Sequence, residues 1–234
     1  MPVQSGFTVY VPVLVARIVL PLVLDIPAVV VPPLPSKVCV PASAYVPSAA
    51  AAADLSKDRD VEYGAAFALA LSGESSRSRA LAKDLETRFP EDTGVKAFYL
   101  PAIRALLELK NGGQPSKAIG LLQLSLPYDR GMPPSGARFV FGVFYTVYVR
   151  GVAFLAANRG REAAAEFQKV IDGRSIVVSD PVGALAHLQL GRALALSGDR
   201  AKANTAYRDF FALWKDADPD IPILKQAKAE YERL

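Results

Sequence analysis

Apolar positions recur with a helical period through most of the chain, and the pattern is clearest between Gly183 and Phe211. Two apolar-faced segments there flank Gly198, which is expected to end the first of them because glycine adopts a positive φ at no steric cost. Gly191 and Ala203 are small residues, one in each segment. We expect them where two antiparallel helices cross, since a larger side chain would hold the helices apart. The stretch therefore predicts a helical hairpin.

The same pattern occurs upstream and predicts three further hairpins. The turn positions Gly73, Gly113, Asn158 and Gly198 are separated by 40, 45 and 40 residues, which predicts four helical pairs stacked in line. The first predicted pair is 59–72 with 75–89, and the second is 93–109 with a helix that begins at Pro115. The third is 137–157 with 161–171, and the fourth is a helix that begins at Pro181 with one from 199 to about 215. The longest predicted loops are 127–136 and 172–180. A charged last helix, 221–234, is expected to cover the end of the stack.

Two local features modify this pattern. Pro101 lies inside the third predicted helix and is expected to kink it or delay its start, with Asp92 or Thr93 as the N-cap. The alanine-rich stretch 48–57 precedes the helical pattern, which we expect to begin at about residue 58.

The first 47 residues differ from the rest, because they are rich in Val and Pro and carry only Arg17, Asp25 and Lys37 as charges. A membrane helix needs about 20 consecutive apolar residues, and Arg17 and Asp25 interrupt the run. A secretory signal is favoured by Ala42-Ser43-Ala44, although no Lys or Arg precedes the apolar run. The other interpretations are an extended, poorly ordered segment, from a misassigned start codon or an upstream frame, and a strand-forming unit.

This contrast divides the chain into a Val/Pro-rich segment, 1–47, and a helical domain, 48–234. We expect the protein to be cytoplasmic, with membrane association or export through the first segment as the alternative. Membrane contact through that segment is possible but not favoured by the pattern.

Composition narrows the function classes. The chain has 51% hydrophobic and 21% charged residues and a net charge of +4, without the Lys/Arg run that marks nucleic-acid binding, so no nucleic-acid partner is expected. Cys39 is the one cysteine and His187 the one histidine, which excludes an internal disulfide and a Cys/His zinc site. We expect His187 to pack on an apolar helical face. The sequence predicts no cofactor and no catalytic residue.

A short acidic motif also has an ordinary explanation. Asp216, Asp218 and Asp220 alternate as at the start of a calcium-binding loop. That loop needs Gly next and Glu at its twelfth position, and this chain has Ile221 and Ala227 there. We interpret the motif as a capped turn between helices and expect no metal site.

Residues from about 48 to 234 resemble bacterial tetratricopeptide domains, in particular C-terminal repeat regions that in other proteins are joined to a eukaryotic-like serine/threonine kinase domain or a winged-helix regulator. The motifs that carry the resemblance are RDVEYGAAFALAL, RFPEDTGVKAFYLP, YVRGVAFLA, AAAEFQKVID, PVGALAHLQLGRALALSGDRAKA and DFFALWKDADPDIPILKQAKAEYERL. The first pair departs from the template, with Ser78 and Ala82 at its second-helix positions. The resemblance implies an all-α superhelix, an α-solenoid, with a C-terminal capping helix.

The resemblance also implies a function, a protein-interaction scaffold. No Gly-rich loop, His-Arg-Asp or Asp-Phe-Gly motif of a kinase occurs, so we expect no enzyme activity. In a tetratricopeptide array the first helix of each pair lines the concave face. The template places eight residues there as a candidate groove for a peptide or helix of a partner protein: Tyr63, Phe67, Ile103, Leu107, Tyr148, Val152, Leu188 and Arg192. Most are apolar, and Arg192 alone matches the cations that bind a carboxylate in some family members.

Two other functions stay open. The chain could be a regulatory fragment of a larger kinase or transcriptional regulator, or a membrane-attached or exported assembly protein. For the aromatic residues between Phe139 and Phe154, we favour packing between neighbouring pairs over a ligand pocket.

Overall fold

The computed structural model describes residues 28–29, 40–41, 45–110, 113–131, 144–177, 180–219 and 221–234. In these residues the fold is all-α, as the periodicity predicts, apart from one short pairing of β1 (Ala28–Val29) with β2 (Val40–Pro41). No strand occurs among the described residues between 58 and 215. Most of the N-terminal segment, with Cys39 and the Ala42-Ser43-Ala44 motif, lies outside the described residues.

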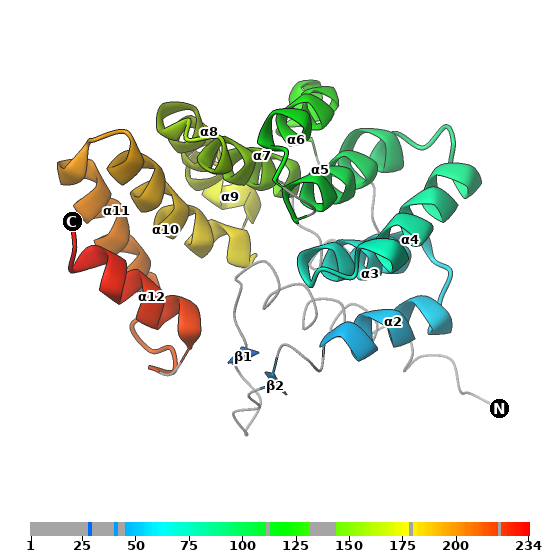
Figure 1. Cartoon of the computed structure of the whole chain (residues 1–234), viewed down its shortest axis with the longest axis horizontal. Coiled ribbons are helices and arrows are strands. Elements are labelled where there is room, and N and C mark those ends of the chain that lie inside the picture. Colours follow the sequence, from blue (N-terminus) through cyan, green and yellow to red (C-terminus); the bar gives the residue numbers. More distant parts are fainter. Residues whose placement is uncertain are drawn as a thin grey trace.

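Four helical pairs account for most of the structure: α3 (Arg59–Leu71) with α4 (Ser75–Arg88), α5 (Leu100–Lys110) with α6 (Pro115–Leu121), α7 (Tyr145–Ala156) with α8 (Gly160–Asp172), and α10 (Pro181–Leu196) with α11 (Arg200–Leu213). Helix α2 (Tyr45–Leu55) packs against α3, and α12 (Pro222–Tyr231) follows α11. From α5 onward, the first helix of each pair contacts both helices of the preceding pair. The pairs follow one another along an arc, with α3, α5, α7 and α10 on its inner side (Figure 1).

The four predicted turn positions share one backbone conformation. The φ angles are +87° at Gly73, +63° at Gly113, +57° at Asn158 and +86° at Gly198. This left-handed conformation closes a helix and is accessible to Gly and, at modest cost, to Asn. The turn predictions are therefore confirmed at all four places.

Each turn also fixes the position of the helix crossing that follows it. Five residues after each turn a small side chain is fully buried: Ser78, Ala118, Ala163 and Ala203. Nine residues after each turn comes a second buried residue: Ala82, Leu122, Phe167 and Tyr207. The four pairs thus share an internal register, although their residue types differ.

The close approach in the last two pairs involves a glycine and an aromatic ring. A Cβ added to Gly191 would lie 2.7 Å from the ring of Tyr207, and one added to Gly151 would lie 2.7 Å from the ring of Phe167. Gly191 therefore lies where its helix meets the partner helix and a larger side chain would be excluded, as predicted, and the side chain that it faces is Tyr207. In the first pair the contact is polar, because Ser78 Oγ donates to the backbone oxygen of Ala66 at 2.7 Å.

Helix caps follow the sequence closely. Asp180 accepts a hydrogen bond from the backbone N–H of Val182 at 3.1 Å and precedes Pro181, as predicted. Asp92 Oδ1 accepts from the N–H of Val95 at 2.9 Å, which confirms one of the two predicted caps of the third helix. Asp and Asn residues at such positions satisfy amides that have no partner within the helix.

The helix containing Pro101 is present over the predicted residues, with one local departure. Helical residues run without a break from Thr93 to Lys110, and the departure is a π-helical turn, η2 (Val95–Tyr99), which precedes α5 at Leu100. Pro101 directly follows this turn and has no N–H to donate, and the wider π-helical turn accommodates it within the helix. The π-helical turn absorbs the change of register that a single α-helix through the proline could not.

Other boundaries also needed correction. Residues 48–57 were not expected to be helical, yet α2 covers most of them, because Ala has the highest helix propensity. The predicted helix 137–157 begins only at Tyr145, after Phe144 with a φ of +79°, and residues 137–143 lie outside the described part. The predicted loop 172–180 contains a short helix, α9 (Arg174–Val177). After α6 the chain continues as a 3-10 helix, η3 (Leu122–Tyr128).

Candidate functional site: the inner helix face

The eight predicted groove residues come from the four inner helices, but most of them are not accessible. Six are buried: Tyr63, Phe67, Ile103, Leu107, Tyr148 and Leu188. Val152 and Arg192 are partly exposed. Helix α3 is buried along residues 60–70 on all of its faces, which is unusual for a helix at a surface. In this structure a partner can reach only the α7 and α10 part of the predicted groove.

Aromatic packing explains why the first part of the groove is closed. The rings of Tyr63 and Tyr99 stack with centroids 3.8 Å apart and planes 4° from parallel. Phe67 lies between Tyr63, at 5.7 Å, and Tyr145, at 5.4 Å in an edge-to-face contact. These rings join α3 to η2 and to α7 and fill the seam between pairs. Burial raises the pKa of Tyr63, Tyr99 and Tyr145 well above the ordinary value, so the hydroxyls stay neutral.

A network of ion pairs locks the first pair to the second. Arg59 donates to Asp60 at 3.0 Å and to Asp92 at 2.6 Å, and Asp92 is also the cap of the next helix. The hydroxyl of Tyr99 donates to the same Asp60 oxygen at 2.7 Å. This junction therefore fixes both the position and the start of the second pair.

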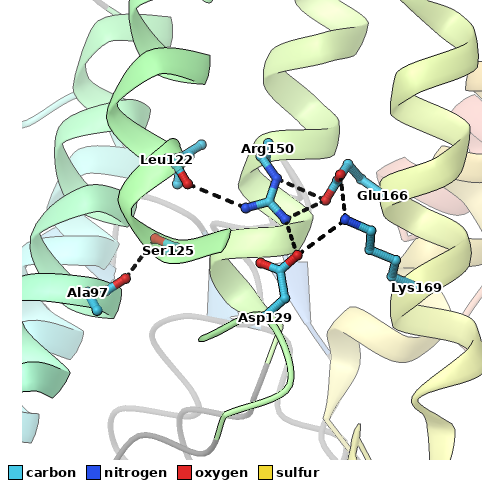
Figure 2. Close-up of polar contacts among 7 residues, drawn as sticks. All are labelled: Ala97, Leu122, Ser125, Asp129, Arg150, Glu166 and Lys169. Atoms are coloured by element: carbon cyan, nitrogen blue, oxygen red, sulfur yellow. Dashed lines mark hydrogen bonds and ion pairs between the residues drawn. The ribbon is translucent and has the colours of Figure 1, made fainter. Parts of the chain in front are cut away.

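The junction between the second and third pairs is centred on a buried arginine (Figure 2). Arg150 of α7 is 1% exposed. It donates to Glu166 at 2.9 and 2.7 Å, to Asp129 at 2.6 Å, and to the backbone oxygen of Leu122 at 3.4 Å. Lys169 bridges the same two carboxylates at 2.9 and 3.2 Å. Burial lowers the pKa of Arg150, but its hydrogen bonds to the two carboxylates outweigh that effect and raise it.

Sequence reasoning did not single out this arginine. A signal was present, because Arg150 is the one charged residue in the apolar helix YTVYVRGVAFLA. A charge in such a helix predicts a buried ion pair, since an unpaired buried charge is strongly unfavourable. The sequence gives no indication, however, of which carboxylates supply the partner charge.

The exposed end of the inner face contains a second arginine cluster. Arg192 of α10 donates to both oxygens of Glu230 of α12, at 2.8 and 2.9 Å. The hydroxyl of Tyr207 donates to Glu230 at 2.9 Å, so one carboxylate accepts bonds from two helices. Gln189 donates to the Tyr148 hydroxyl at 3.2 Å and lies 3.5 Å from Arg192. Arg192, Tyr207 and Gln189 are called the carboxylate seat below.

The tyrosine hydroxyls in and beside the carboxylate seat, those of Tyr207 and Tyr148, are suited to hydrogen bonding rather than to proton transfer. Burial raises the pKa of Tyr148 to about 12, against the lowering effects of the Gln189 hydrogen bond and of Arg192. Burial also raises the pKa of Tyr207 above its ordinary value, and the Glu230 hydrogen bond adds to this. Both tyrosines therefore act as neutral hydrogen-bonding groups near pH 7.

His187 packs on α10 as predicted and is half-buried, with its Nδ1 3.9 Å from Asp209. Burial lowers its pKa, and Asp209 opposes that shift. The Asp216–Asp218 part of the acidic motif lies in the turn before α12, and no cluster of three or more metal-ligating side chains occurs among the described residues. Within that same part of the chain, no helix has both the length and the apolar character needed to cross a membrane.

Comparison with protein-family models, with curated proteins and with solved structures finds no match to this chain.

Proposed function

We propose that residues 48–234 form a tetratricopeptide-like array of four helical pairs that acts as a non-enzymatic scaffold for binding another protein. The observation that carries this proposal is the shared register of the pairs. A left-handed turn residue, a small buried residue five positions later and a second buried residue nine positions later occur in all four. Independent helices of one globular core need no common register, whereas stacked repeats do.

The order of contacts supports the same proposal. Each pair after the first uses its inner helix to contact both helices of the pair before it. Stacked repeats have this nearest-neighbour pattern, and their curvature creates an extended inner surface that suits an elongated ligand. The capping helix of the proposal is α12, which buries Ile223, Leu224 and Ala227.

The side chains that are accessible on the inner face indicate which kind of ligand would bind there. Val152 offers an apolar contact, and Gln189 and Arg192 carry hydrogen-bonding groups that in this structure contact Tyr148 and Glu230. A helix or an extended peptide with apolar anchors and an acidic group matches these side chains. We therefore place partner binding at α7 and α10 and not at the buried rings of α3.

The first test places a photo-crosslinking amino acid at Val152 on the inner side or at Ala165, an exposed residue of the outer helix α8. We expect the Val152 position, and not the Ala165 position, to crosslink one defined protein in the cells that make this chain. That protein is then purified and titrated against the full chain by calorimetry. Val152→Arg should weaken binding about tenfold or more, because it removes an apolar contact and blocks the face, and Ala165→Arg should leave binding unchanged. Equal binding by both variants would contradict the proposal.

A further inference from the structure

The carboxylate seat holds an acidic side chain from the chain's own last helix. Three hydrogen bonds, two from Arg192 and one from Tyr207, converge on the Glu230 carboxylate. A guanidinium that binds both oxygens of a carboxylate provides orientation as well as attraction. The seat is thus a formed receptor for a carboxylate on a helix.

Several features of α12, the helix that occupies the carboxylate seat, favour its reversible detachment. It has ten residues, so it depends on its packing against the rest of the chain to stay helical. It packs against α11 less extensively than α11 packs against α10. The Arg192 and Glu230 side chains are 22% and 26% exposed, so water competes for their ion pair. Figure 1 shows α12 as the last helix at one end of the arc.

The residues that dock α12 define a simple pattern. Ile223, Ala227 and Glu230 are spaced at i, i+4 and i+7, which places them on one face of a helix. Leu224 is also buried, and the ring of Tyr231 lies 6.0 Å from that of Tyr207 and 5.6 Å from that of Phe211. A helix of another protein with the same apolar and acidic positions would meet the same surface.

We infer that the carboxylate seat is a binding site for an acidic amphipathic helix of a partner protein, which takes the place of α12. This inference rests on the proposed function and names its partner class: apolar residues at i, i+1 and i+4 followed by Glu at i+7. Because α12 is tethered, its effective concentration at the seat is on the order of millimolar, and a partner helix must outcompete it. Any change that weakens the contact of Glu230 with Arg192 and Tyr207 raises the fraction of chains in which α12 has left the carboxylate seat. The apparent affinity for the partner helix rises with that fraction.

The probe for this site is a fluorescein-labelled peptide of residues 221–234, titrated by fluorescence anisotropy into the full-length chain. We expect Glu230→Gln in the chain to strengthen peptide binding about fivefold or more, because the tethered helix loses its ion pair. Glu232→Gln is the matched control, since Glu232 is an exposed residue of the same C-terminal stretch, and it should bind the peptide as the wild type does. With Arg192→Gln, peptides that carry Glu or Gln at position 230 should bind equally.

Circular dichroism melting shows that each variant is folded, and hydrogen exchange of the unmodified chain gives a second measurement. Amides of α12 should exchange at least about tenfold faster than those of α11. Equal protection of the two helices overturns the inference. It is also overturned if the Glu230→Gln chain binds the peptide no better than wild type, or if no chain binds it. If the peptide experiment fails while Val152→Arg still weakens partner binding, only the inference about an α12-like ligand is rejected. If the peptide experiment succeeds while Val152→Arg leaves partner binding unchanged, the proposed scaffold function is rejected.

Discussion

Arg150 is the residue on which the junction between the second and third pairs depends. It is buried, yet its guanidinium reaches two carboxylates and a backbone oxygen from two segments, η3 with its C-cap Asp129, and α8. Buried ion pairs contribute little net stability when both partners are replaced by apolar groups, because burying the charges is unfavourable. Removal of Arg150 alone is different, since it leaves the two carboxylates with the partly exposed Lys169 as their neighbouring cation.

We therefore expect Arg150→Met to lower the free energy of unfolding by about 3–5 kcal/mol, measured by urea titration. Lys169 still contacts Glu166 and Asp129 but is too exposed to compensate fully. The matched control is Arg208→Met on α11, where the side chain is exposed and the expected change is within about 0.5 kcal/mol. A similar, small effect of both substitutions would show that the network is not a structural junction.

At the scale of the elements, the helical pairs are defined by their turns and crossings. The sequence predicts these well, because Gly73, Gly113, Asn158 and Gly198 stand at positions that require a positive φ, and small residues stand where helices approach. It does not predict the π-helical turn, which is one of several ways in which a helix accommodates a proline, or the start of α7 at Tyr145.

The crossing geometry gives a test in which helix propensity and packing oppose each other. Gly191→Ala should destabilise the protein by about 1–3 kcal/mol, because the new methyl group meets the ring of Tyr207 at 2.7 Å in a packed core. Helix propensity alone favours Ala over Gly by about 1 kcal/mol. Gly120→Ala in α6 is the matched control, since no atom beyond its own stretch of helix lies within 4 Å of the added Cβ, and it should stabilise the protein. Thermal unfolding measures both; stabilisation by Gly191→Ala would contradict the packing.

The candidate site was predictable only in outline. The template placed Tyr63, Phe67 and Tyr148 on the inner side of the helices, but burial depends on which rings meet across pairs, and residues far apart in sequence supply them. Arg192 was predicted as a groove cation, and the structure places Glu230 of the last helix against it. That pairing spans 38 residues, and no local pattern indicates it.

At the scale of the whole molecule, four pairs with one register follow an arc (Figure 1). In the array that we propose, each pair is stabilised by its neighbours, and the inner surface extends as pairs are added. The two ends are covered differently, by α2 against α3 and by α12 beside α11. The proposed binding function depends on this order, because a face that spans several pairs exists only if the pairs are in line.

The most direct test of that order is a set of spin-label distances between equivalent outer residues of the four pairs. Arg77, Lys117, Glu162 and Lys202 each lie four residues after their turn and are exposed. With Cys39 replaced by serine, pulsed electron resonance on double-cysteine variants gives the distances from residue 77 to the other three. We expect them to increase in the order 117, 162, 202, by roughly 10 Å per pair as packed helices require. A distance from residue 77 to residue 202 no longer than that from 77 to 117 would contradict the array.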